Sequence, residues 1–318
     1  MDLTIIIVNW NGGDMIHRCL SSVAIAQKHL QVQVIVVDNA SRDGSREMVA
    51  REFPQIEVID SGANLGFAKG NNLARPRTKS DLVLFLNPDT VLLENSLLPM
   101  VEFVRRHPEV GGLGCKMRDP NGEVQEQGLQ YFPTPWTEFL SILFLSTGSH
   151  RRFRRWLPYL DPNCSSYVTK LYGGCLLCRK TVLDQLGWFD ERYFMYAEDV
   201  DLCRRISERG ARLYYLSSAE IVHVAGGSSL KAPSGFSILM KAESIEKLMG
   251  KHYGVLGALL YRVATFSGAA ARLAALLFLR TLSLLSRVGR GTDFPGAFFK
   301  YRLLLLWSLG LKRAAIAR

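Results

Sequence analysis

The chain has 318 residues, 48% of them hydrophobic and 21% charged, a composition typical of a globular protein with one large domain and an appendage. The formal net charge of +10 arises from residues 251–318, which hold 11 Lys or Arg and one acid, while residues 1–250 are neutral overall. Because the basic residues gather in the C-terminal segment, this distribution argues against a nucleic-acid-binding main domain.

The cysteines and the N-terminus indicate the compartment. No charged leader precedes the strand-like run that begins at Leu3, so we expect no signal peptide. The six cysteines show no metal-finger spacing. Cys175 and Cys178 form a C-x-x-C inside the apolar run GGCLLCRK, and we expect them to be buried in a strand rather than to bind metal. These features are typical of a reducing cytoplasm.

Short apolar runs alternate with helical patterns along the first hundred residues. Strands are expected at residues 3–8, 32–37, 56–59 and 82–86, and helices from Asp14 as the N-cap, at 47–53, around 69–72 and at 96–106. The first run, LTIIIV at residues 3–8, is continuous and rich in β-branched residues, as a strand covered on both faces should be. The alternation predicts a parallel sheet with helices on both faces.

Polar residues follow each of these strands: Asn9 and Asn11, Asp38 and Asn39, Asn64, and Asn87 with Asp89. In a parallel sheet such ends lie along one edge, so they predict a nucleotide-sized cleft there. The chain contains neither G-x-G-x-x-G after the first strand nor G-x-x-x-x-G-K-[ST]. Without a glycine loop to hold phosphate, a metal ion becomes the expected partner of a diphosphate.

The stretch DLVLFLNPDT, residues 81–90, is the most informative part of this edge. Pro88 ends the strand because it cannot donate to a sheet ladder. Asp89 is therefore presented at the carboxyl edge of the sheet, where a carboxylate can hold a divalent cation and, through it, a diphosphate. The alternative is an Asp that caps the next helix.

Residues 131–160 differ in character from the sheet-forming part. An apolar run at residues 139–145 is followed by four arginines, at positions 151, 152, 154 and 155. This excursion either packs on the sheet or touches lipid headgroups or the acceptor, and the sequence leaves both open.

The chain then returns to core character, with a strand expected at residues 172–177, a turn at 186–191 and a helix at 203–209. Three carboxylates precede that helix, at Glu198, Asp199 and Asp201, among aromatic residues. Asp201 is expected to complement the helix dipole. Glu198 and Asp199 are expected to be partly buried, and burial raises the pKa of a carboxylate and makes it a better base near neutral pH.

Two short strands are expected next, at residues 213–216 and 220–224. The second carries His223, which precedes a flexible Gly-Gly-Ser-Ser sequence. Such a histidine is either a satisfied core residue or a contact to metal or phosphate.

Six pieces of the chain occur together in one order: IIIVNWNG (5–12), VVDNASRDGS (36–45), NLGFAKGNN (64–72), LFLNPDT (84–90), GWFDERYFMYAEDVDLCRR (187–205) and IVHVAGGSS (221–229). In this combination the chain resembles a family 2 glycosyltransferase of the GT-A fold, more narrowly the bacterial rhamnosyltransferase-like subgroup, over roughly residues 3–230. The resemblance implies a Rossmann-like, mostly parallel α/β sheet with helices on both faces. It also implies inverting sugar transfer from a nucleoside diphosphate donor with a divalent metal, Mg²⁺ or Mn²⁺.

The resemblance also implies roles by position. Asp38 is similar to the residue that holds the nucleobase, Asp199 to the general base, and Asp89 and His223 to the metal or diphosphate ligands. The other nucleotide-sugar contacts that it implies are Asn9, Asn11, Asn39, Asn64, Gly66, Asn71 and Asn87. On the acceptor side it implies Glu198 and Trp188, and Trp188 replaces a small residue, which is expected to narrow the acceptor pocket. Asn87 replaces the first acid of the usual D-x-D motif, which implies a weaker metal site completed largely by the diphosphate.

Residues 254–287 are rich in Leu and Ala and carry Arg262, Arg272, Arg280 and Arg287. At 100° per residue these arginines fall within about 80° of one another, so one narrow cationic stripe lies beside a wide apolar surface. No apolar run reaches 18 residues without an Arg, which favours a helix in the membrane interface over a spanning one. Residues 298–311 repeat the pattern. The alternative is packing on the protein or another subunit, but the scarcity of acids favours the membrane.

The sequence thus predicts a nucleotide-sugar transferase domain at residues 1–250 and a basic, amphipathic helical segment at 251–318. The expected function is metal-dependent transfer of a sugar, rhamnose from dTDP-rhamnose by resemblance, onto a cell-surface glycan or polyprenyl-linked acceptor at the inner face of the cytoplasmic membrane. Two alternatives stay open. One is a non-catalytic partner in glycan assembly, which the amide at Asn87 would suit. The other is a sugar-phosphate nucleotidyltransferase, which would need an Arg in the loop at residues 9–13.

Overall fold

The computed structural model of the chain describes residues 1–125, 131–144, 160–224, 235–286 and 294–315. The chain divides into two compact units, one formed by residues 1–132 and 158–231 and the other by residues 133–157 and 232–316. Three predicted features lie outside the described residues: the four arginines of residues 151–155, the Gly-Gly-Ser-Ser sequence after His223, and Arg287.

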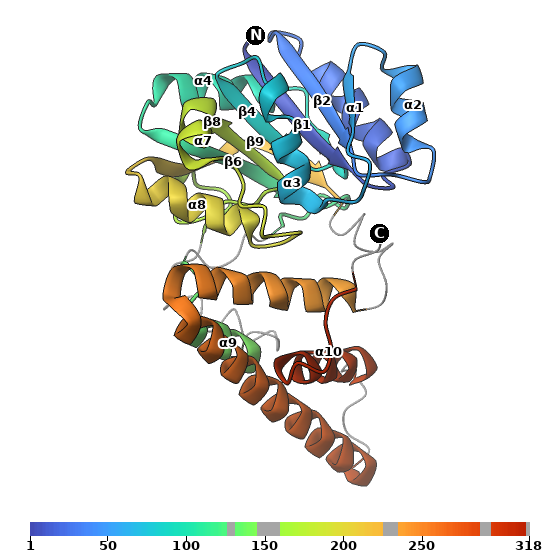
Figure 1. The fold of residues 1–318 in the computed structure, drawn as a ribbon, viewed down its shortest axis with the longest axis vertical. Helices are drawn as coiled ribbons and strands as arrows, with labels where there is room; N and C mark the ends of the chain where they lie inside the picture. The colour runs from blue at the N-terminus through green and yellow to red at the C-terminus, as the bar shows by residue number, and fades with distance from the viewer. Residues whose placement is uncertain (126–130, 145–159, 225–234, 287–293, 316–318) are drawn as a thin grey trace. The chain divides into compact units, whose positions relative to one another are not determined.

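A nine-stranded sheet forms the centre of the first unit (Figure 1). Its strands follow the order β3-β2-β1-β4-β8-β6-β9-β5, with β7 paired to β9. The four predicted strands, β1 (Leu3–Asn9), β2 (Val32–Asp38), β3 (Glu57–Asp60) and β4 (Leu82–Leu86), are parallel neighbours. Their carboxyl ends therefore lie along one edge, as expected from the polar residues that follow them.

The other half of the sheet mixes directions. It contains β5 (Thr90–Leu92), β6 (Val110–Arg118), β7 (Ser166–Val168), β8 (Cys175–Arg179) and β9 (Arg212–His223). β8 runs antiparallel to both β4 and β6, and β9 runs parallel to β6 and antiparallel to β5 and β7. Cys175 and Cys178 are buried, free thiols on β8, as predicted.

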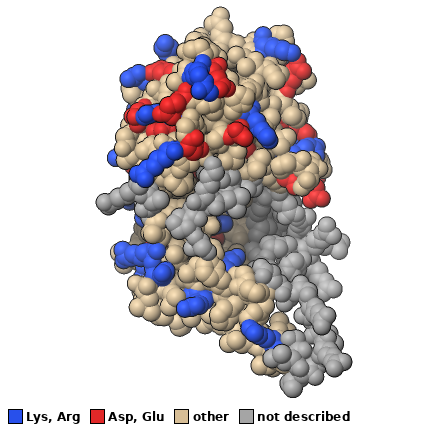
Figure 2. Space-filling view, turned by 90° about the vertical axis from the view of Figure 1, so that its right-hand side faces the viewer, with Lys and Arg blue, Asp and Glu red and all other residues tan. Residues whose placement is uncertain are grey.

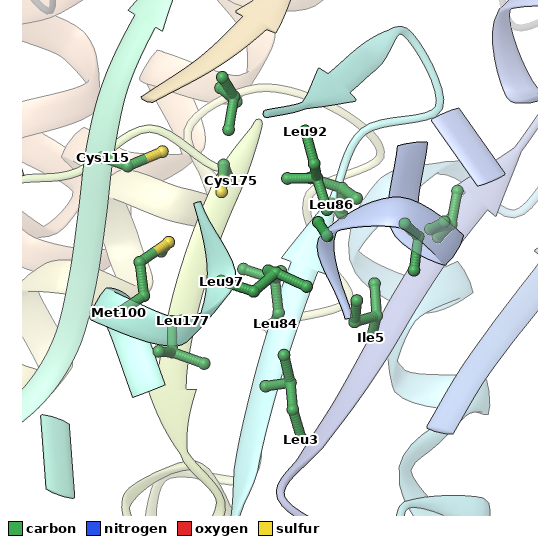
Figure 3. Packing of buried hydrophobic residues seen from close by; sticks show 14 of the residues in the cluster. Leu3, Ile5, Leu84, Leu86, Leu92, Leu97, Met100, Cys115, Cys175 and Leu177 are labelled. Atoms are coloured by element: carbon green, nitrogen blue, oxygen red, sulfur yellow. The ribbon is translucent and has the colours of Figure 1, made fainter. Parts of the chain in front are cut away.

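Alternate residues of β1 pack on opposite faces of the sheet, which explains why most of the strand is apolar. Ile5 and Ile7 belong to one buried cluster, and Ile6 and Val8 to the other. The first cluster includes residues of α1 (Asp14–Ala26), α2 (Ser45–Glu52) and α4 (Leu97–Arg106), and the second includes residues of α3 (Gly66–Leu73), α7 (Lys180–Leu186) and α8 (Glu198–Glu208). Figure 3 shows part of the first cluster, with the leucines of β4 beside Leu97 of α4. This two-sided burial is the main source of the unit's stability.

Several predicted boundaries were wrong. The helix expected at residue 203 begins at Glu198, so the acids lie in its first turn, where the helix dipole favours them. The strands expected at 213–216 and 220–224 are one strand, β9, because a register shift against β6 accommodates the polar residues between them. The strand expected from residue 172 begins at Cys175, and Gly13 rather than Asp14 is the N-cap of α1.

The second unit is helical. It comprises α5 (Pro135–Phe144), α9 (Phe236–Ser286) and α10 (Phe294–Ser308), and α5 and α10 both pack against α9. α9 bends at Gly254, whose φ of 70° lies outside the helical range (Figure 1). By length and composition, the described residues contain one helix that could cross a membrane, at Phe236–Thr281.

The described arginines of the predicted cationic stripe contact α10. The guanidinium groups of Arg262, Arg272 and Arg280 lie over the rings of Trp307, Tyr301 and Phe294, respectively. Arg262 also pairs with Glu246. Such cation–π contacts contribute about 0.5–2 kcal/mol each. The stripe therefore helps to hold α10 against α9, while the apolar surface of α9 is left exposed, from Val255 at 87% to Phe278 at 64%.

Candidate active site

The carboxyl ends of β1 and β2 place two predicted residues in direct contact. Asn9 and Asp38 are register partners, and Asn9 Nδ2 donates to Asp38 Oδ1 at 2.9 Å. The other oxygen, Asp38 Oδ2, accepts from the backbone N–H of Ser41 at 2.9 Å. Both side chains are fully buried, so the bonds fix the carboxylate of Asp38 in one orientation. Asn11 follows in left-handed conformation, and its Oδ1 accepts from the backbone N–H of Arg42 at 2.7 Å.

Asn39, after β2, and Asn64, after β3, both hydrogen-bond to the backbone of Gly66. Asn39 Nδ2 donates to the carbonyl of Gly66 at 2.9 Å, and Asn64 Oδ1 accepts from the Gly66 N–H at 3.2 Å. Gly66 has a φ of +80°, and a Cβ there would lie 2.1 Å from the carbonyl oxygen of Phe194. Only glycine permits this approach. Gly66 therefore packs against the backbone of Phe194, in the loop that precedes the acids of α8.

Three of the predicted asparagines carry buried acceptors that lack a partner. Among the described residues, the Oδ1 atoms of Asn9, Asn39 and Asn71 have no hydrogen bond. An unpaired buried acceptor costs about 1–3 kcal/mol. Three of them, on residues that the sequence assigns to a donor site, indicate that waters or polar ligand atoms belong beside them.

Asp89 and His223 meet where β5 pairs with β9. Thr90 lies opposite His223 in the ladder, and the Asp89 carbonyl accepts from the backbone N–H of Val224 at 2.9 Å. The Oδ1 atom of Asp89 lies 3.4 Å from Nε2 of His223, and the two side chains are 8% and 16% exposed. A carboxylate and an imidazole 134 positions apart in the chain are thus brought together by strand pairing.

The residues beside this pair can be compared with the ligands of a divalent cation. A Cβ built on Gly174 would lie 3.5 Å from Asn87 Nδ2 and 3.7 Å from His223 Nε2, so Gly174 borders both side chains. Carboxylate and diphosphate oxygens are ligands that Mg²⁺ and Mn²⁺ prefer, whereas an imidazole nitrogen is typically a ligand of transition metals. Among the described residues, no group of three or more His, Cys, Asp or Glu side chains is placed so that it could hold a metal ion by itself. Asp89 and His223 could therefore supply only two ligands, and a cation at this position would need the others from its substrate.

The acids of α8 form the second part of the site. Asp199 accepts from the backbone N–H groups of Gly173 at 2.9 Å and Val200 at 2.8 Å. Burial raises the pKa of Asp199, and these two hydrogen bonds oppose the rise. Burial, and then the charge of Asp199, raise the pKa of Glu198 to about 8. Burial therefore favours the protonated form of Glu198.

The backbone before these acids is strained. Tyr196 and Ala197 have φ values of 67° and 65°, although neither is glycine. Each left-handed residue of this kind costs about 1–2 kcal/mol. Strain of this sort gathers at functional sites, where the surrounding structure enforces it, and here it sets the direction in which α8 begins.

Two consecutive glycines join the two parts of the site. Gly173 contacts Asp199, while Gly174 faces Asn87 and His223. The carbonyl of Gly174 also accepts from the backbone N–H of Asn87 at 3.0 Å. We did not predict a role for this pair or for Gln125, whose Oε1 lies 2.9 Å from Nδ1 of His223. Two consecutive glycines before an apolar strand could have indicated the role of Gly173 and Gly174. A single Gln in a loop gives no such indication for Gln125.

Two further side chains differ from expectation. Trp188 is fully buried, its Nε1 donates to Asp184 at 2.9 Å, and its ring packs edge-on against Phe85. It lies in the core of the unit, so we do not include it in the proposed acceptor site. Asp201 lies in the first turn of α8, where the helix dipole favours it as predicted, but it is also completely buried and pairs with Arg205 at 2.7 Å, which was not predicted.

The sequence of the chain is similar to those of known glycosyltransferases. Residues 4–187 match the family model described as glycosyl transferase family 2. An N-acetylglucosaminyl-diphospho-decaprenol L-rhamnosyltransferase of Mycobacterium tuberculosis is 29% identical over 79% of this chain and 85% of its own. The rhamnosyltransferase WbbL of Escherichia coli is 27% identical over 70% of this chain and 83% of its own.

Solved structures share the fold. The mannosyltransferase PcManGT of Pyrobaculum calidifontis, in complex with GDP-Man and Mn²⁺, has a TM-score of 0.57 at 17% identity, covering 96% of this chain and 87% of its own. TarS of S. aureus, residues 1–349 with UDP-GlcNAc, has a TM-score of 0.51 at 16% identity, covering 98% and 92%. The expected GT-A-type fold is thereby confirmed.

Proposed function

Because the chain belongs to glycosyltransferase family 2, we propose that it transfers rhamnose from dTDP-rhamnose, with inversion, to a hydroxyl of a polyprenyl-diphosphate-linked N-acetylglucosamine. Family membership makes the chain a glycosyltransferase and favours this hypothesis over a nucleotidyltransferase or an inactive partner. The names of two relatives support the sugar, and one of them also supports the acceptor. The observation that carries the proposal is the position of Asp199 against Gly173 and of His223 against the adjacent Gly174, with Asp89 beside His223.

The residues divide the reaction between them. The fixed carboxylate of Asp38, with Asn9 beside it, binds the nucleoside part of the donor. Asp199 takes the proton of the acceptor hydroxyl, and its raised pKa suits a base that works near neutral pH. The oxygen attacks the anomeric carbon as the bond to the nucleoside diphosphate breaks on the opposite face. One base and no protein nucleophile give inversion.

Asp89 and His223, with Asn87 nearby, are the residues that would hold Mg²⁺ or Mn²⁺. When bound, such an ion neutralises the charge that develops on the leaving diphosphate. The protein supplies only one carboxylate to this position, so we expect the affinity for the ion alone to be low and to rise when the nucleotide is present.

A transfer assay with competing donors tests the proposal. The protein is given a short polyprenyl-diphosphate N-acetylglucosamine and an equal mixture of dTDP-rhamnose, UDP-glucose and UDP-N-acetylglucosamine with Mg²⁺. We expect a single product that contains rhamnose, with the anomeric configuration opposite to that of the donor by NMR. A product from a UDP-sugar would support the proposed transferase activity but contradict rhamnose as the sugar transferred. Retention of configuration would contradict the role of Asp199.

We further propose that the helical unit binds the inner face of the cytoplasmic membrane, where such an acceptor lies. The exposed residues of α9 after its bend include many large apolar ones: Val255, Leu256, Leu259, Leu260, Val263 and Phe266, and further along Leu277, Phe278 and Leu279. No Asp or Glu occurs from Lys251 to Thr292. On the face drawn in Figure 2, the charges of this unit are mostly Lys and Arg, whereas the α/β unit shows both signs. An apolar surface flanked by positive charge complements an anionic lipid surface.

Vesicle sedimentation tests this association. Leu256, Leu259 and Val263 lie within about 60° on one helix face, and replacing all three with Glu is expected to weaken binding to phosphatidylglycerol-containing vesicles at least about 100-fold. The variant Ile25→Glu, at an exposed apolar position of α1, is the matched control and should bind as the unchanged protein does. Unaltered binding of the triple variant, or a change in its oligomeric state instead, would count against the membrane.

A further inference from the structure

Gln125 contacts His223 with both ends of its side-chain amide. Its Nε2 donates to the backbone carbonyl of His223 at 2.6 Å, and its Oε1 lies 2.9 Å from Nδ1 of the same residue. Because the NH₂ group is directed to a carbonyl, the other end of the amide is an acceptor. The hydrogen of the neutral imidazole therefore belongs on Nδ1, where it is donated to Gln125.

Several hydrogen bonds hold the loop that carries Gln125 in its conformation. Asp119 Oδ1 accepts from the backbone N–H groups of Asn121 at 2.9 Å and Glu123 at 2.8 Å, and the Asp119 N–H donates to the Glu123 carbonyl at 2.8 Å. The N–H of Gln125 then returns to β6 by donating to the carbonyl of Met117 at 2.9 Å. The loop thus doubles back along β6 and delivers the amide to His223.

The consequence lies at the other ring nitrogen. With the hydrogen on Nδ1, Nε2 has a free lone pair, and Nε2 is the atom that lies 3.4 Å from Asp89 Oδ1. A ring in the opposite state would direct an N–H at that carboxylate and would close the position with a hydrogen bond. The tautomer set by Gln125 keeps a nitrogen and an oxygen side by side as acceptors, which is the arrangement a cation needs.

We propose that Gln125 is a positioning residue that fixes the tautomer and ring orientation of His223, so that Nε2 faces Asp89 as a ligand. The part that concerns the cation rests on the proposed function, whereas the part that concerns the tautomer does not. Hydrogen-bond partners of this kind on a metal-binding histidine change metal affinity by about 10–100-fold when they are removed.

The tautomer is tested by ¹⁵N NMR of the histidine rings in metal-free protein at a pH where His223 is neutral. The chain has six histidines, and the signal of His223 is identified by its loss in His223→Gln. We expect a protonated Nδ1 and a bare Nε2 in the unchanged protein. We expect Gln125→Met, which keeps the length but neither hydrogen bond, to give a mixture of tautomers, and Gln125→Glu, which restores the acceptor, to return the signal toward its original position.

Binding of Mn²⁺ in the presence of dTDP, followed by EPR, is the second readout. Gln125→Met should bind Mn²⁺ about 10–100-fold more weakly, while Glu123→Gln, at an exposed position of the same loop, should match the unchanged protein in both experiments. A bare Nδ1 in the unchanged protein, or a tautomer that survives Gln125→Met, would overturn the inference. If the tautomer behaves as expected but the unchanged protein binds no Mn²⁺, the inference about Gln125 stands and the proposed metal site fails.

Discussion

Asp199→Asn is expected to lower kcat about a thousandfold or more while leaving the affinity for the donor nucleotide unchanged. Asn keeps one side-chain oxygen that can accept from the Gly173 N–H and loses the bond from the Val200 N–H, so the contact with Gly173 should persist. It cannot take a proton from the acceptor hydroxyl, and loss of a general base typically costs about 10²–10⁴ in rate. Steady-state transfer kinetics and nucleotide titration of the same preparation separate the two effects.

The control for Asp199 lies on the same helix. Glu208 is exposed and pairs only at the surface with Arg204 among the contacts described, so Glu208→Gln should retain normal turnover and differ in stability by less than about 1 kcal/mol. Turnover by Asp199→Asn within tenfold of the unchanged protein would remove Asp199 from the role of base. Glu198 would then be the next carboxyl group to test, because its pKa is also raised by burial.

Asp89→Asn is expected to lower transfer at least about 100-fold, the scale for removing one group that stabilises charge in the transition state. The substitution keeps the shape of the side chain but removes the charge that would hold a cation beside His223. The loss should extend to binding: the unchanged protein should bind dTDP more tightly with Mg²⁺ than without, and the variant should show no such difference.

Asp81→Asn provides the matched control for Asp89. Asp81 immediately precedes β4, at the opposite end of the strand from Asp89, and is exposed. Its replacement removes the same charge from the same strand but not from the site. If Asp81→Asn and Asp89→Asn had equal effects, or if EDTA left transfer by the unchanged protein intact, the assignment of Asp89 to the metal position would be wrong.

The sequence was sufficient for the parallel half of the sheet because each strand there is a short, mostly apolar run followed by polar residues. In β4 the run 82–86 and the break at Pro88 match the observed strand end, so the place of Asp89 followed from local chemistry alone. The same logic brought Asn9 and Asp38 to one edge, since both end parallel neighbours.

The remainder depended on contacts that no local pattern encodes. The pairing of β5 with β9 is what brings His223 to Asp89, and the start of α8 depends on two left-handed residues that are not glycine. Asn72, next to the predicted Asn71, forms hydrogen bonds with both the N–H and the carbonyl of Phe189. Trp188 lies in the core, where it contacts Phe85 and Asp184. These outcomes are set by tertiary packing rather than by propensity.

The most direct test of the account is whether the sheet edge at Asp38 and Asp89 binds the expected donor. The melting temperature of the purified chain is measured with dTDP-rhamnose, dTDP, UDP-glucose and GDP-mannose, each with Mg²⁺, Mn²⁺ or EDTA, because a ligand specific to the native state must raise it. We predict a rise with dTDP-rhamnose that is much reduced by EDTA and absent in Asp89→Asn. If no nucleotide or nucleotide-sugar shifts the melting temperature, with metal or without, the edge is not a donor site and the account fails.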